Sequence, residues 1–133
     1  MNNRPLPDND HISRYCKPSH MGQNGMLLPA AFLPRKGERY LSVNWLEYFG
    51  EADLGDAIEQ VREVFRRKGY KVKSNGRFAV LEVGAAKAVG DTLSIKHLPS
   101  INDESHAGIF GDITSATATA LAMLAGQNLY PAI

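Results

Sequence analysis

The sequence has a single cysteine, and it lacks both a long apolar run and a leader pattern at its start. Because Cys16 has no second cysteine to pair with, no internal disulfide can form, which is typical of a reducing compartment. No apolar run approaches the roughly 20 residues of a membrane-spanning helix. Residues 1–10 contain no apolar core of a signal peptide. We therefore expect a cytoplasmic protein that does not contact membranes.

An excess of charge of one sign is also missing. Fifteen Lys and Arg residues stand against fourteen Asp and Glu residues, which gives a net charge of +1. Proteins that bind duplex DNA usually carry a marked basic excess, so no duplex DNA partner is expected. The 133 residues, 44% hydrophobic and 22% charged, match one globular domain. We expect a flexible N-terminal lead-in over residues 1–10 and a single domain over 11–133.

The standard motifs of nucleotide-binding loops and esterase elbows are absent. The sequence contains no G-x-x-x-x-G-K-[ST], no G-x-G-x-x-G and no G-x-S-x-G. Cys16 and His20 lie close together, but no second pair at a zinc-site spacing completes a ligand set. His11-Ile12-Ser13 supplies only one of the two His-x-Ser/Thr motifs that two-histidine phosphoesterases carry. We expect neither a metal nor a cofactor.

The clearest strand pattern covers residues 40–45. Leu41, Val43 and Trp45, the only tryptophan, alternate with Ser42 and Asn44. Alternation with a period of two predicts a strand with one face in the core and the other polar. Ser42 and Asn44 would then present short hydrogen-bonding side chains from a rigid support, which is a favourable place for a binding site.

A helix is predicted over residues 54–68. Its apolar positions recur with helical spacing, at Leu54, Ile58, Val61 and Phe65. Asp53 is suited to cap its first turn, and Gly69 is suited to end it. The short link from the preceding strand predicts that this apolar stripe packs on Leu41, Val43 and Trp45.

The remaining elements are shorter. We expect strands at 11–16, 26–33, 92–97 and 106–110, a hairpin of 70–73 with 78–83 around Asn75-Gly76, a bulge or single helical turn at 84–90, and a last helix capped by Thr114 or Ser115 that ends near Ala125. Most strands follow one another directly. The fold class is therefore predicted as α+β, a single domain with a largely antiparallel sheet of about six short strands packed by two helices.

Candidate catalytic residues gather near the end of the chain. His97 ends one predicted strand and His106 begins the next, with Asp103 and Glu104 in the loop between them. Both imidazoles could meet at one end of the sheet, where Asp103 or Glu104 would orient a ring for general acid–base work. In the alternative, His97 fills a half-buried strand position and His106 holds the loop through a backbone hydrogen bond.

Arg14 is the candidate anion-binding residue. An arginine in a mostly apolar strand requires a carboxylate or phosphate partner, because burying it without one is costly. The simpler interpretation pairs it with Glu47 or Asp103 and gives it a structural role only. Ser42 and Asn44 are candidates for hydrogen bonds to the same ligand.

Four short segments carry a resemblance. They are Arg14-Tyr15-Cys16, Ala31-Phe32, Leu41-Ser42-Val43, and Pro99…Asp103…His106-Ala107-Gly108-Ile109-Phe110-Gly111. In these segments the chain resembles a widespread group of small, uncharacterised bacterial proteins. It departs from them at Tyr15, where a second basic residue is expected, and in the segment Asn44-Trp45-Leu46-Glu47. The resemblance implies a bacterial origin and a compact domain, and it assigns no catalytic residue.

Two functions remain open from the sequence. The first is a small cytosolic bacterial accessory module that is not catalytic and binds a protein partner, through an exposed apolar patch at 26–32 or 46–49. The alternative is a small hydrolase or transferase that acts on a phosphate-containing small molecule. In that case Arg14 binds the anion, and Ser42 and Asn44 hydrogen-bond the substrate. His106 and His97 then supply acid–base chemistry, oriented by Asp103.

Overall fold

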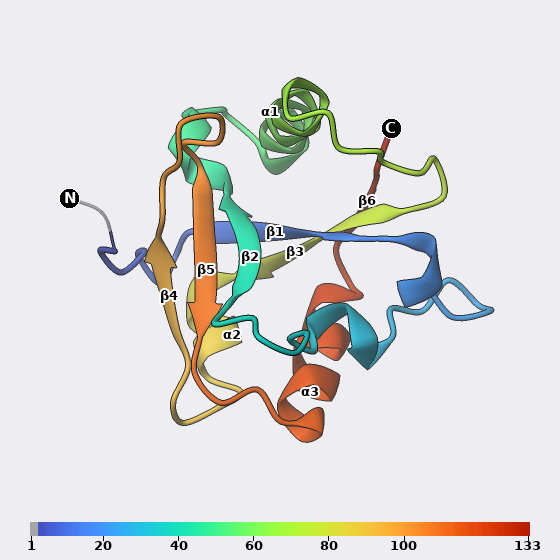
Figure 1. Cartoon of the computed structure of the whole chain (residues 1–133), viewed down its shortest axis with the longest axis vertical. Helices are drawn as coiled ribbons and strands as arrows, with labels where there is room; N and C mark the ends of the chain where they lie inside the picture. The colour runs from blue at the N-terminus through green and yellow to red at the C-terminus, as the bar shows by residue number, and fades with distance from the viewer. Residues whose placement is uncertain (1–2) are drawn as a thin grey trace.

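The computed structural model describes residues 3–133, and its centre is one six-stranded antiparallel sheet (Figure 1). The strands are β1 (His11–Cys16), β2 (Leu41–Trp45), β3 (Arg77–Glu82), β4 (Ser94–His97), β5 (His106–Phe110) and β6 (Leu129–Pro131). Their order across the sheet is β4-β5-β2-β1-β3-β6, and every neighbouring pair is antiparallel. The predicted α+β class with an antiparallel sheet is confirmed.

Helices cover both faces of the sheet. They are α1 (Leu54–Arg67), α2 (Val83–Lys87) and α3 (Ser115–Ala125), with the 3-10 turns η1 (Pro18–His20), η2 (Pro29–Phe32) and η3 (Leu46–Phe49). The long helix α1 lies on one side, and α2 and α3 lie on the other (Figure 1). Two separate groups of buried side chains result, one on each face. Two helices were predicted, and α2 stands where a bulge or single helical turn was expected.

Helix α1 forms where its local signals predict. Asp53 caps it, and its carboxylate accepts a hydrogen bond from the Asp56 backbone N–H at 2.8 Å. Gly69 follows the helix with φ +74°, a left-handed conformation that glycine adopts without strain. The buried side of the helix carries Ala57, Ile58, Val61 and Val64.

The side of the sheet on which α1 packs differs from the prediction. Ile58 and Val61 pack with Phe78 on one face, whereas Leu41 and Val43 belong to the core on the opposite face. The reason is the turn η3, which ends at Gly50 with φ +68° and carries the chain around the end of β2. Trp45 lies on the face of Leu41 and Val43 and is only half-buried.

Two predicted strands are not strands in the structure. Within residues 26–33 the structure has an isolated bridge at Leu27 and the turn η2 at Pro29–Phe32, since Pro29 has no N–H to donate to a ladder and suits the first position of a helical turn. Residues 70–73 make no strand either, so the predicted hairpin is wrong. β3 pairs with β1 on one side and with the unpredicted edge strand β6 on the other.

Residues 3–10, expected as a flexible lead-in, pack along the edge strand β4. The Leu6 backbone N–H donates to the Ile95 carbonyl at 3.0 Å, and Pro5 pairs with Lys96 in an isolated bridge. The Leu6 side chain is 3% exposed and belongs to the core. This segment is therefore part of the domain. Residues 1–2 lie outside the described residues.

Within residues 3–133, none of the helices combines the length and the apolar character of a membrane-spanning segment.

Candidate functional site

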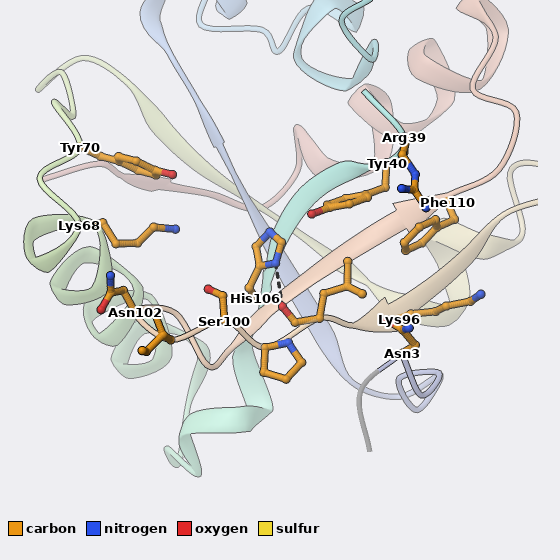
Figure 2. A pocket seen from close by; sticks show the side chains of 13 residues that line it. Asn3, Arg39, Tyr40, Lys68, Tyr70, Lys96, Ser100, Asn102, His106 and Phe110 are labelled. Carbon is orange, nitrogen blue, oxygen red and sulfur yellow. Dashed lines mark hydrogen bonds between the residues drawn. The ribbon is translucent and has the colours of Figure 1, made fainter. Parts of the chain in front are cut away.

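On the face of the sheet that α1 covers, β2 and β5 contribute side chains to two adjoining cavities. The narrower has a volume of about 400 Å³ and the wider about 930 Å³. They share Lys68, Tyr70 and His106, so we describe them together as the groove. Figure 2 shows the wider cavity, with His106 near its centre and the Lys68 ammonium pointing inward.

Pairing between β1 and β2 ends early, and this opens the narrower cavity. The two strands pair only at Ile12 with Trp45 and at Ser13 with Asn44. Beyond these pairs β2 curves away from β1 (Figure 1). Arg14 lies in the resulting gap, where its Nε donates to the Ala31 carbonyl at 2.5 Å and its Nη1 to the Ser42 carbonyl at 2.8 Å.

Among residues 3–133, no carboxylate forms a salt bridge with Arg14: Glu47 pairs with His11 at 2.6 Å and Asp103 with Lys68 at 2.9 Å. The predicted structural pairing of Arg14 is therefore wrong. Loss of hydration on burial lowers the pKa of its guanidinium; the nearby Cys16 and Glu38 oppose this shift, and Arg35 adds to it.

His106 and Ser42 face one another in the groove. His106 Nδ1 lies 2.9 Å from the Leu98 carbonyl (Figure 2), and its Nε2 lies 3.3 Å from Ser42 Oγ. A carbonyl oxygen can only accept, so this bond assigns the proton to Nδ1 and leaves Nε2 as the acceptor in a neutral ring. The geometry is that of a base next to a hydroxyl.

Asp103 is placed to hold other residues rather than to orient His106. Its side chain is 1% exposed and accepts hydrogen bonds from Asn44 Nδ2 at 2.9 Å and Ser105 Oγ at 3.1 Å, as well as from Lys68. The Leu98 carbonyl takes the orienting role that was predicted for Asp103. Asp103 and Asn44 still line the narrower cavity.

His97 lies on the opposite face of the sheet, so the predicted meeting of two imidazoles is wrong. It is 9% exposed, its Nε2 lies 2.7 Å from the Glu104 carbonyl, and its ring packs edge-on to Trp45 with centroids 5.0 Å apart. The register places Ala107 opposite His97, which directs His106 to the other face. His97 thus fills a structural position, as the alternative interpretation had it.

Five of the six candidate site residues line one cavity. They are Arg14, Ser42, Asn44, Asp103 and His106, and His97 is the exception. Two further lining residues were not predicted: Ser13 Oγ and His20 Nδ1 are buried, and neither has a hydrogen-bond partner among the described residues. Burial lowers the pKa of His20, and Lys17, Arg14 and Arg35 lower it further. The sequence offered one sign of this role for Ser13: it is a polar residue inside the predicted strand 11–16.

The charges of this near-neutral chain are unevenly distributed. Seven of its fifteen Lys and Arg residues line the groove, against two of its fourteen Asp and Glu residues, Glu38 and Asp103. The seven cationic residues are Arg14, Lys17, Arg35, Arg39, Lys68, Lys71 and Lys96. A cleft lined by charge of one sign raises the local concentration of ligands of the other sign.

Between residues 3 and 133, no three His, Cys, Asp or Glu side chains come together as a metal ion would require. No protein-family model, no curated protein and no solved structure matches the chain.

Proposed function

We propose that this protein is a small hydrolase or transferase that binds a phosphate-containing small molecule in the groove. The observation that carries the proposal is Arg14, a cation withdrawn from water that borders the narrower cavity and has no carboxylate partner among the described residues. A bound phosphate would supply the missing negative charge.

Arg14 is held so that it can bind an anion without first being reorganised. Two backbone carbonyls fix its guanidinium and leave further N–H groups unused. Charge-assisted hydrogen bonds from arginine to phosphate are short and directional. Ser13 Oγ, which lines the same cavity and has no hydrogen-bond partner among residues 3–133, supports the proposal because buried polar groups are rarely left without partners.

The chemistry is assigned to His106. Its Nε2 can take a proton from Ser42 Oγ, or from a water molecule or substrate hydroxyl in the same place, and can return it to a leaving group. Asn44, fixed by Asp103, forms part of the wall of the cavity. Of the predicted catalytic residues, His106 keeps a chemical role, Asp103 becomes a positioning residue and His97 has none.

The test is a turnover screen with a panel of phosphate monoesters and diesters. His106→Ala should lower any detected turnover by about a hundredfold, the usual scale for losing a general base. His97→Gln is the matched control, since it changes the histidine on the opposite face and should leave turnover unchanged. The same purified protein should bind inorganic phosphate in calorimetry, and Arg14→Met should abolish this binding. Equal turnover in the two histidine variants would disprove the assignment.

A second candidate function is the non-catalytic accessory module of a bacterial system, which binds a protein partner. It is favoured by Met26 and Met123, which are 68% and 70% exposed and line one shallow apolar cavity with Leu28. In the other proposed docking segment, 46–49, Leu46 is buried, whereas Tyr48 is 40% exposed and donates a hydrogen bond to Glu104. A pull-down from the native host should then recover a partner that Met26→Glu with Met123→Glu releases. Recovery of the chain alone would eliminate this candidate.

A further inference from the structure

We infer that the phosphate-containing ligand is a nucleotide, whose base stacks on Tyr40 and Phe110 while its phosphate meets Arg14. The inference rests on the proposed function of the same groove and adds the class of its ligand. It follows from the wider cavity, whose aromatic floor plays no part in binding phosphate.

Two aromatic rings form this floor. Tyr40 and Phe110 lie with their ring centroids 5.0 Å apart and their planes at 36°, and the His106 ring lies 5.8 Å from Tyr40. Both rings are half-buried, and the Lys96 ammonium lies over the Phe110 ring, 5.2 Å from its centroid. Aromatic side chains on an open sheet face are a recurrent support for nucleic-acid bases, because every base has a π-face.

Gly108 allows Tyr40 to lie close against the sheet. A Cβ atom at position 108 would come within 2.6 Å of Tyr40 Cδ1, a distance that real Cβ atoms do not adopt. Any other residue would lift the ring from β5. The glycine therefore builds the floor, and it offers a variant that displaces the ring without altering its chemistry.

The wall of the wider cavity suits a base edge and a phosphate. Arg39, Lys68 and Lys96 line it, and no Asp or Glu of residues 3–133 does. Ser100 and Asn102 add hydrogen-bonding groups. The hydroxyls of Tyr40 and Tyr70 point toward each other across the opening (Figure 2). A volume of about 930 Å³ lies within the range of small-molecule sites.

One ligand can reach both ends of the groove because the two cavities join. Tyr40 and Phe110 line the wider cavity and Arg14 lines the narrower one, and the two share Lys68, Tyr70 and His106. A sugar phosphate would fill the Arg14 end and leave the aromatic floor exposed to water.

Titration calorimetry of the full chain with four probes tests this inference: AMP, UMP, ribose 5-phosphate and inorganic phosphate. AMP and UMP should bind at least about tenfold more tightly than ribose 5-phosphate, as expected for stacking of one base. Tyr40→Leu and Gly108→Ala should each reduce this ratio to near one while leaving the affinity for inorganic phosphate unchanged. Tyr48→Leu, which alters an exposed aromatic outside the groove, should preserve the ratio.

The outcomes separate the two proposals. If ribose 5-phosphate binds as tightly as the nucleotides to the wild-type protein, the nucleotide inference is overturned and the phosphate function stands. If none of the four probes binds, both are overturned. The wild-type comparison needs no variant, so a failure of Gly108→Ala to fold would not protect the inference.

Discussion

Asp103→Ala should destabilise the domain strongly, because this carboxylate is buried and charged. It is 1% exposed and accepts three hydrogen bonds, from Lys68, Asn44 and Ser105. Removing one partner of a buried ion pair costs about 3–5 kcal/mol, since the other charge is left uncompensated. The Lys68 side chain is 18% exposed and can turn toward water, so we expect the lower end, about 3 kcal/mol.

Thermal unfolding of the purified variant measures this cost. For a chain of this size, about 3 kcal/mol corresponds to a fall in Tm of roughly 10 °C. Asp103→Asn should cost less, because an amide oxygen still accepts from Asn44 and Ser105. Glu59→Ala is the matched control: Glu59 pairs with Arg62 and Arg66 on the surface of α1, and its loss should leave Tm nearly unchanged. If Asp103→Ala and Glu59→Ala have the same Tm, the Asp103 carboxylate contributes no more to stability than a surface carboxylate, and the reasoning is wrong.

Two further predictions concern the core. Burial raises the pKa of the Cys16 thiol to about 12 from its usual 9.0, so a thiol reagent at pH 8 should leave the folded protein unmodified and react fully in denaturant. The raised value means that the contribution of Cys16 to stability is complete below pH 9 and is lost as the pH rises toward 12, which urea unfolding of Cys16→Ala and wild type across that range should show. Trp45→Ala should cost about 3 kcal/mol, the low end for a large aromatic because the ring is half-buried, and it also removes the 2.8 Å bond to Asp10. Ser42→Ala removes an exposed hydroxyl and should be nearly neutral in the same melts; the reverse order would mean that the faces of β2 are assigned wrongly.

Helix α1 could be predicted because the information for it is local. A capping aspartate, an apolar stripe with helical spacing and a closing glycine all lie within residues 53–69. The face on which it packs could not be predicted, since it depends on how the four-residue link from η3 to the helix, residues 50–53, turns at Gly50. Periodicity predicts an element but does not report the direction in which the chain leaves it.

The prediction of short strands was wrong for a related reason. The four residues 70–73 alternate, yet no strand pairs with them, and β3 finds its partners in β1 and β6. β6 spans three residues and ends at Pro131, a residue that is tolerated at the edge of a sheet and weakens any prediction of a strand. Whether such a segment joins a sheet depends on which edges the rest of the fold leaves open, and this cannot be known from the segment alone.

The candidate site shows how one residue in a loop decides which side chains meet. The β4–β5 ladder pairs His97 with Ala107 and Ile95 with Ile109, so His97 and His106 fall on opposite faces. A loop one residue longer or shorter would have brought them to the same face, because side chains alternate with a period of two. Arg14 reached the groove for a different reason: β1 and β2 separate after Ser13, and its guanidinium fills the gap at the carbonyl of Ser42. Residue types indicated the chemistry of the site, whereas strand register and an interrupted ladder determined its members.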